Sequence, residues 1–297
     1  MPAYKRQHFL PCVYLKNFSP DGIRATRDSK VWRMDEARCA CVPVKSQCAG
    51  DYLFSKQDPR KAEHEFQAIE EGYASALAKI WTEGEPTVFE YFALIFATFD
   101  LYTRNIAHEN LTGLEGVQAY NLRTLTMLNR LVVGNYEAEA LSPAELKAQL
   151  MRSWGVRLFH TPVGEIVTSD HPALCFNWGK TSAIDFILLP LTPTVCAVIF
   201  DKRTTRTKGS TLTVDDGATL FDALVTHCNS CIYASSEPDK GVVETFRILW
   251  RRRSPPHTTT DPEKWALELI IPRSNAFSFV QPVDSANLGL GVTRSIG

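Results

Sequence analysis

The sequence lacks any apolar run long enough to cross a bilayer. Its longest such stretch, FALIFATF at positions 92–99, is far shorter than the roughly 20 apolar residues of a membrane helix. The chain begins MPAYKRQH, which is polar and basic, and no apolar core of a secretory signal follows. We therefore expect a cytoplasmic protein without a membrane partner.

An excess of charge of either sign is also missing. The 297 residues include 32 Lys and Arg against 33 Asp and Glu, which leaves a formal net charge of −1. The apolar fraction of 44% is ordinary for a soluble globular protein. Because no overall field draws the chain onto a polyanion, any nucleic acid or nucleotide would have to bind at a local site.

The common sequence signatures of catalysis are absent as well. There is no GxSxG elbow, no P-loop and no dinucleotide-binding glycine run. Eight cysteines are present, but without a signal peptide their thiols are expected to be reduced. Zinc is not the expected metal, because Cys39, Cys41 and Cys48 lack knuckle spacing. Cys228 and Cys231 fall on the apolar face of an expected helix, where cysteine packs as a small hydrophobe.

Residues 1–55 combine a short helix with β-type runs. Pro11 suits the first position of a helix over 11–18, and the turn Ser-Pro-Asp-Gly at 19–22 ends it. A small β-meander is then expected from runs at 23–26, 30–34 and 39–44.

Residues 59–153 change to a helical period. Phe66, Ile69, Tyr73 and Leu77 fall on one stripe of the first helix. Ser142, with Pro143 and Glu145 after it, has the pattern of a capping box. Helices are expected at 59–80, 87–104, 114–133 and from Ser142 onward.

Residues 154–297 return mainly to a strand period. Two later helices are expected at 215–234 and 242–251, and the segments 265–272 and 277–282 would add edge strands. The segregated order predicts one α+β domain over 1–297, with a mainly antiparallel sheet after the helical block. The main strands are expected at 156–161, 165–170, 173–177, 185–191 and 195–200.

A first candidate site is the stretch KRQHFLPCVYLKNF at positions 5–18. A helix beginning at Pro11 would turn unpaired amides and a positive dipole end toward anions. His8 would then donate to a phosphate, carry a proton or coordinate a metal, and Lys16 would hold phosphate. The alternative is that His8 caps the helix or packs beside Phe9.

A second candidate is Asp170, in the segment Thr-Ser-Asp-His-Pro that closes an expected strand. Loops at strand ends often present reactive groups, so Asp170 would hold a divalent metal, orient a histidine or act as general base. The alternative is a turn in which Asp170 bonds the backbone just before the strand at 173–176.

Glu70 and Arg104 are candidates on the helical block. Glu70 borders the apolar stripe of its helix, where it would either face a pocket or form a solvated rim. Arg104, near the end of the next helix, would clamp an anion or pair with a glutamate, and the pairing is the favoured role.

Several of these residues also carry a resemblance to a known family. The opening QHF-x-P-x-x-YLKNFS, Ile69-Glu70, Arg104, the segment TSDHP at 168–172 and Asn229 occur in an order that resembles domain of unknown function 4238. The resemblance covers roughly residues 5–235, and the family is broad, mostly bacterial and without an assigned activity. It implies site positions, with Asn229 as a further substrate contact, but no mechanism.

Two hypotheses remain open from the sequence. In the first, favoured slightly, the protein is a hydrolase of phosphodiesters or nucleotides, with His8, Asp170 and Glu70 catalytic. His8 and Asp170 would hold Mg²⁺ or Mn²⁺, and Lys16, Arg104 and Asn229 would bind phosphate. In the second, it is a non-catalytic binding protein in which His8, Arg104 and Asp170 form a structural polar network. Either would suit a stress response or phage defence.

Overall fold

The computed structural model describes residues 6–51, 59–82, 86–110, 142–162, 164–178, 184–253, 271–272 and 277–283. Their order of elements confirms the α+β class, since helices and mainly antiparallel strands occupy separate parts of the chain. The helix expected at 114–133 and most of the strand expected at 265–272 lie outside the described residues. The single domain over 1–297 stays a prediction.

Three of the described helices, α5, α6 and α7, begin at a residue whose side chain caps the helix. The Ser142 hydroxyl accepts from the Glu145 amide and the Glu145 carboxylate accepts from the Ser142 amide, so the predicted capping box is confirmed. Thr213 and Asp216 form a second capping box in the same way. The helices are α1 (Cys12–Leu15), α2 (Pro59–Thr82), α3 (Val88–Asn110), α5 (Pro143–Ser153), α6 (Val214–His227) and α7 (Lys240–Arg252).

The largest sheet of the described residues has five strands in the order β12-β7-β8-β9-β5. Every pairing is antiparallel except that of β12 with β7. All seven residues of β8 are buried, as expected of a strand covered on both faces. The strands are β5 (Trp154–His160), β7 (Leu174–Asn177), β8 (Phe186–Thr192), β9 (Val195–Asp201) and β12 (Ile271–Pro272).

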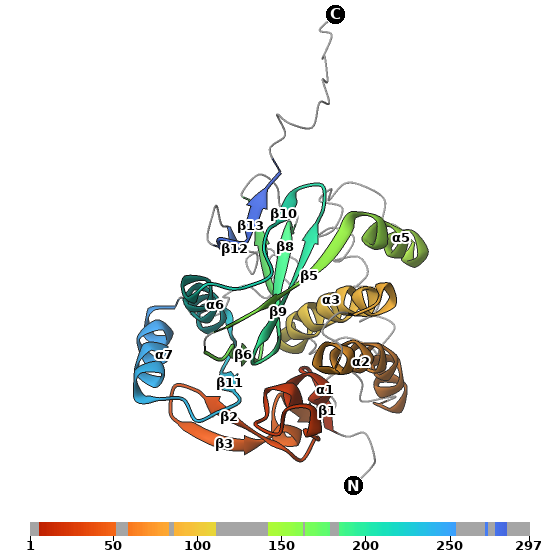
Figure 1. The fold of residues 1–297 in the computed structure, drawn as a ribbon. Helices are drawn as coiled ribbons and strands as arrows, with labels where there is room; N and C mark the ends of the chain where they lie inside the picture. The colour runs from red at the N-terminus through yellow and green to blue at the C-terminus, as the bar shows by residue number, and fades with distance from the viewer. Residues whose placement is uncertain are drawn as a thin grey trace, which may run out of the picture.

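Helices cover both faces of this sheet, which Figure 1 shows standing between α3 and α6. Successive residues of a strand point to opposite faces, so β9 contributes to two separate cores. Ala197 and Ile199 pack in the cluster that contains Leu94 of α3. Cys196 and Val198 pack in the cluster that contains Leu224 of α6.

A four-stranded sheet joins the N-terminal part of the chain to two later strands, in the order β3-β2-β11-β6. The hairpin of β2 (Lys30–Met34) and β3 (Cys39–Pro43) confirms part of the expected meander. β11 (Ile232–Ala234) lies between β2 and β6 (Thr168–Ser169). Two further pairs are β1 (Arg6–His8) with β4 (Ala49–Asp51) and β10 (Thr205–Thr207) with β13 (Val280–Pro282).

Tyr14 fastens the N-terminal helix to these sheets. Its hydroxyl donates to the Pro190 carbonyl at 2.7 Å and lies 2.6 Å from the Thr168 hydroxyl. Because a phenol has one proton, Thr168 is the donor in the second bond. The expected helix over 11–18 is present as α1 followed by the 3₁₀ turn η1 (Lys16–Phe18).

Three local predictions were wrong. Residues 23–26 are not a strand, because local bonds from Arg24 and Ala25 to the carbonyls of Asp21 and Gly22 close the 3₁₀ turn η2 (Gly22–Arg24). Gly22 has the left-handed φ of +55° that this turn requires. The strand expected at 165–170 is limited to β6. The helix expected to reach 234 ends at His227.

A third 3₁₀ turn, η3 (Val44–Ser46), follows β3.

Candidate functional site

Asp170 lies directly after β6 and is 1% exposed. Its carboxylate accepts hydrogen bonds from the turn between α6 and β11. The Asn229 amide donates to Oδ1 at 2.9 Å, and the amide and hydroxyl of Ser230 donate to Oδ2 at 2.7 and 2.6 Å. The Asp170 amide donates to the Cys231 carbonyl at 3.2 Å. The partner of Asp170 is therefore a turn about 60 residues away, rather than the backbone just before the strand at 173–176.

Burial raises the pKa of Asp170, and the hydrogen bonds from Ser230 and Asn229 oppose that rise. The two effects act on the same carboxylate, since donors aimed at it favour the charged form while loss of water disfavours it. The arrangement is typical of an internal acceptor that fixes a turn.

The sequence had predicted that Asn229 lies in a helix. In the structure it lies in this turn. α6 ends at His227, and the Cys228 amide makes the last helical bond to Leu224. Arg253, at the end of α7, donates to the carbonyls of Cys228 and Asn229 at 2.6 and 3.3 Å. Asp170 and Arg253 thus form hydrogen bonds with backbone amides and carbonyls that would have made helical hydrogen bonds in a longer helix.

Arg253 was not among the candidate site residues that the sequence indicated. Its guanidinium lies 3.3 Å from the ring centre of Trp250 and reaches back to the carbonyls at the end of α6. The local sequence holds no signal for this contact, because its partner is 24–25 residues away.

Arg104 is 1% exposed and pairs with two carboxylates. Its NH1 lies 2.8 Å from Oε1 of Glu70, and its Nε lies 2.7 Å from Oδ2 of Asp100. The guanidinium carbon lies 3.9 Å from the ring centre of Phe66. Arg104 therefore pairs with Glu70, as the favoured prediction had it. Asp100 was missed, although it stands four residues before Arg104, a spacing typical of ion pairs on a helix.

Asp100, which belongs to this ion-pair group, has a strongly shifted pKa. Burial raises its pKa to about 6, with the attraction of Arg104 opposing the rise and the charge of Glu70 adding to it. Glu70 keeps 31% of its side chain exposed, so water shares in stabilising its charge.

A small cavity lies beside this ion pair, lined by Tyr14, Tyr73, Glu70 and Asp100 among others. Its cavity volume is about 10 Å³, which is about the space that one water molecule needs. The Tyr73 hydroxyl is buried and has no hydrogen-bond partner among the described residues. Space and chemistry here suit nothing larger than a water molecule.

His8 lies on β1, opposite Ala49 of β4, and is half-buried. Its Nε2 lies 3.3 Å from the Lys45 carbonyl. α1, the helix that follows, has only four residues and begins after Pro11. A helix of one turn has little dipole, so it offers little attraction for the expected phosphate.

The predicted metal ligands His8 and Asp170 are thus held by different partners, the Lys45 carbonyl and the turn at 229–230. Within the described ranges, no three side chains of His, Cys, Asp or Glu lie together as a metal site would require. Cys228 and Cys231 are buried, and burial raises the pKa of the Cys231 thiol to about 12. Such thiols stay protonated at neutral pH, which makes them poor nucleophiles.

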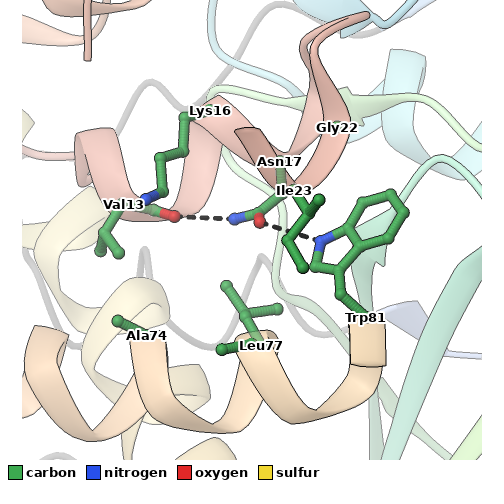
Figure 2. A pocket seen from close by; sticks show the side chains of 9 residues that line it. Val13, Lys16, Asn17, Gly22, Ile23, Ala74, Leu77 and Trp81 are labelled. Carbon is green, nitrogen blue, oxygen red and sulfur yellow. Dashed lines mark hydrogen bonds between the residues drawn. The ribbon is translucent and has the colours of Figure 1, made fainter. Parts of the chain in front are cut away.

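Lys16 lines a groove between α2 and the segment formed by α1, η1 and η2. In Figure 2, Ala74 and Leu77 lie below, Lys16 and Val13 at one end, and Ile23 and Trp81 at the other. The groove contains about 350 Å³ of free space, counting the solvent open to it. No motif had indicated this groove, because its two walls are about 60 residues apart in the sequence.

None of the described helices has both the length and the apolar character of a membrane span. A family model described as "Protein of unknown function (DUF4238)" matches residues 6–245. No curated protein and no solved structure matches the chain significantly.

Proposed function

Since the chain belongs to the DUF4238 family, which has no assigned activity, we propose from its own side chains that it is a non-catalytic binding protein. In this proposal His8, Arg104 and Asp170 are structural. The observation that carries it is the carboxylate of Asp170, which accepts three hydrogen bonds from one turn.

A general base or a metal ligand needs an accessible lone pair, and the donors of Asn229 and Ser230 take three of the roughly four acceptor positions of the Asp170 carboxylate. The side chain is also 1% exposed, so a substrate would have to displace the turn to reach it. Removing the buried acceptor of these three hydrogen bonds destabilises the fold, which is the effect expected of a structural residue.

Arg104 supports the same proposal, because its guanidinium is buried between Glu70 and Asp100 and pairs with both. A phosphate would have to compete with two carboxylates for this one cation. The hydrolase remains the competing prediction, together with its nucleic acid or nucleotide substrate, and the cytoplasmic location also stays a prediction.

The test compares the wild type with Asp170→Ala on single- and double-stranded DNA and RNA, with Mg²⁺ or Mn²⁺ present. We expect no cleavage by either protein. We also expect Asp170→Ala to lower the free energy of unfolding by about 2 kcal/mol, since it removes the buried acceptor of three part-buried hydrogen bonds.

Asp215→Ala is the matched control, because Asp215 is an exposed aspartate at the start of α6 and should cost less than about 1 kcal/mol. Asp170→Asn serves as the milder variant, because its side chain keeps one acceptor oxygen. Cleavage by the wild type that disappears in a folded Asp170→Asn protein would overturn the proposal and favour the hydrolase.

A further inference from the structure

The groove of Figure 2 has a preformed apolar surface. The Trp81 indole donates to Oδ1 of Asn17 at 3.2 Å, which fixes the aromatic wall. The amide nitrogen of Asn17 donates in turn to the carbonyls of Val13 and Tyr14 at 2.7 and 2.9 Å. Every polar atom of the Asn17 side chain is therefore engaged within the protein, and an apolar ligand would face no unpaired amide there.

Lys16 is the only charged residue among the side chains that line the groove. It is half-buried, and no ion pair joins it to any residue that the structure describes. No carboxylate shares the lining, so the charge at this end of the groove is unbalanced and would attract an anion.

The walls of the groove favour a small molecule over a peptide. They are turns of α1, η1, η2 and α2, so the groove presents no strand edge to which an extended peptide would add. Its floor runs from Ala74 to Trp81 on α2, a span of about 10 Å at the rise of a helix. Its cavity volume of about 70 Å³ is well below that of pockets which enclose a drug-sized ligand, so a small ligand would lie along the groove and stay partly exposed.

We propose that this groove binds a small amphipathic carboxylate, with the carboxylate at Lys16 and a straight apolar chain over Leu77 toward Trp81. This assignment deepens the proposed function, because it names the ligand class of a binding protein. The cation at one end matches the acid group, and the apolar floor matches the chain.

The test titrates octanoate into the full chain by calorimetry, with octanol as the uncharged counterpart. We expect one octanoate per chain, and weaker binding of octanol. Lys16→Gln should weaken octanoate roughly fivefold, the scale of a partly exposed ion pair. Lys240→Gln is the matched control, because Lys240 is an exposed lysine at the start of α7. This variant should bind octanoate with the affinity of the wild type.

A second variant, Ala78→Phe, fills the groove from a position where the native side chain is exposed. It should abolish octanoate binding while its melting temperature stays near that of the wild type. No binding of octanoate to the wild type, or equal affinity in the wild type and Lys16→Gln, would overturn the assignment. These outcomes are independent of the nucleic acid cleavage assay, which tests whether the protein is a catalyst.

Discussion

At the scale of single residues, two buried tyrosines in the same cavity wall have opposite hydrogen bonding. The Tyr14 hydroxyl bonds to Thr168 and Pro190, whereas the Tyr73 hydroxyl has no partner in the part of the chain described. Both rings are almost fully buried, and their centroids lie 5.9 Å apart. The pair separates the contribution of a hydroxyl's hydrogen bonds from that of the ring's burial.

We expect Tyr14→Phe to lower the free energy of unfolding by about 1–2 kcal/mol, because it leaves the Pro190 carbonyl and the Thr168 hydroxyl without a buried partner. Tyr73→Phe should cost nothing or stabilise slightly, because it removes a buried hydroxyl that has no protein partner. Urea unfolding of both variants gives the comparison. An equal loss in both would contradict it and would indicate that a water molecule in the cavity binds Tyr73.

The sequence predicted part of the site at this scale. Residue type and position singled out Asp170, Arg104 and Glu70 as candidate site residues, and the pairing of Arg104 with a glutamate was the favoured role. The sequence did not predict the partners of Asp170 and Arg253, because both residues contact the turn at 228–230 from segments 24 to 60 residues away. Contacts of that kind depend on how the sheets assemble.

At the scale of elements, the ion pairs of Arg104 lie between α2 and α3. Glu70 belongs to α2, while Asp100 and Arg104 are one turn apart on α3. Burial raises the pKa of Asp100 from 3.8 to about 6, so its charged form is less favourable in the folded protein than in the unfolded chain. The contact between the helices therefore depends on pH.

A raised pKa means that the folded state binds the Asp100 proton more tightly. The stabilisation is complete below pH 3.8 and is lost as the pH rises through about 6. Asp100→Asn lacks this titration, so the stability of the variant relative to the wild type should rise by roughly 1 kcal/mol between pH 5 and pH 7. Urea unfolding at both pH values measures it.

A difference between the two proteins that does not change with pH would contradict the raised pKa of Asp100. Asp201→Asn is the control, because Asp201 is another buried aspartate, paired with the half-exposed Arg203 on a different part of the fold. The same rise between pH 5 and pH 7 in that variant would show that the rise does not come from Asp100.

Element boundaries were predictable where the sequence carries its own caps. The Ser142 capping box and the strands β2, β8 and β9 appear close to their expected positions, because local bonds or continuous apolar runs specify them. α6 was expected to continue to residue 234, because Cys228 and Cys231 extend its apolar spacing. The helix ends earlier, at His227, because Asp170 and Arg253 form hydrogen bonds with the backbone of residues 228–230.

At the scale of the whole molecule, segments distant in sequence meet around the turn at 228–231. β11, which follows the turn, pairs with β2 from the N-terminal part and with β6, which precedes Asp170. Composition and periodicity predicted the α+β class and a mainly antiparallel sheet. They did not predict that β2 and β3 join β11, because strand partners are chosen by packing of the complete chain.

A double-mutant cycle between Asp170 and Ser230 tests most directly whether Asp170 holds this turn. Asp170→Ala, Ser230→Ala and the double variant would be unfolded in urea. The hydrogen bond of 2.6 Å predicts a coupling energy of about 1–2 kcal/mol, so the double variant loses less than the sum of the single ones. Additive losses, with a coupling energy near zero, would contradict the structural role assigned to Asp170.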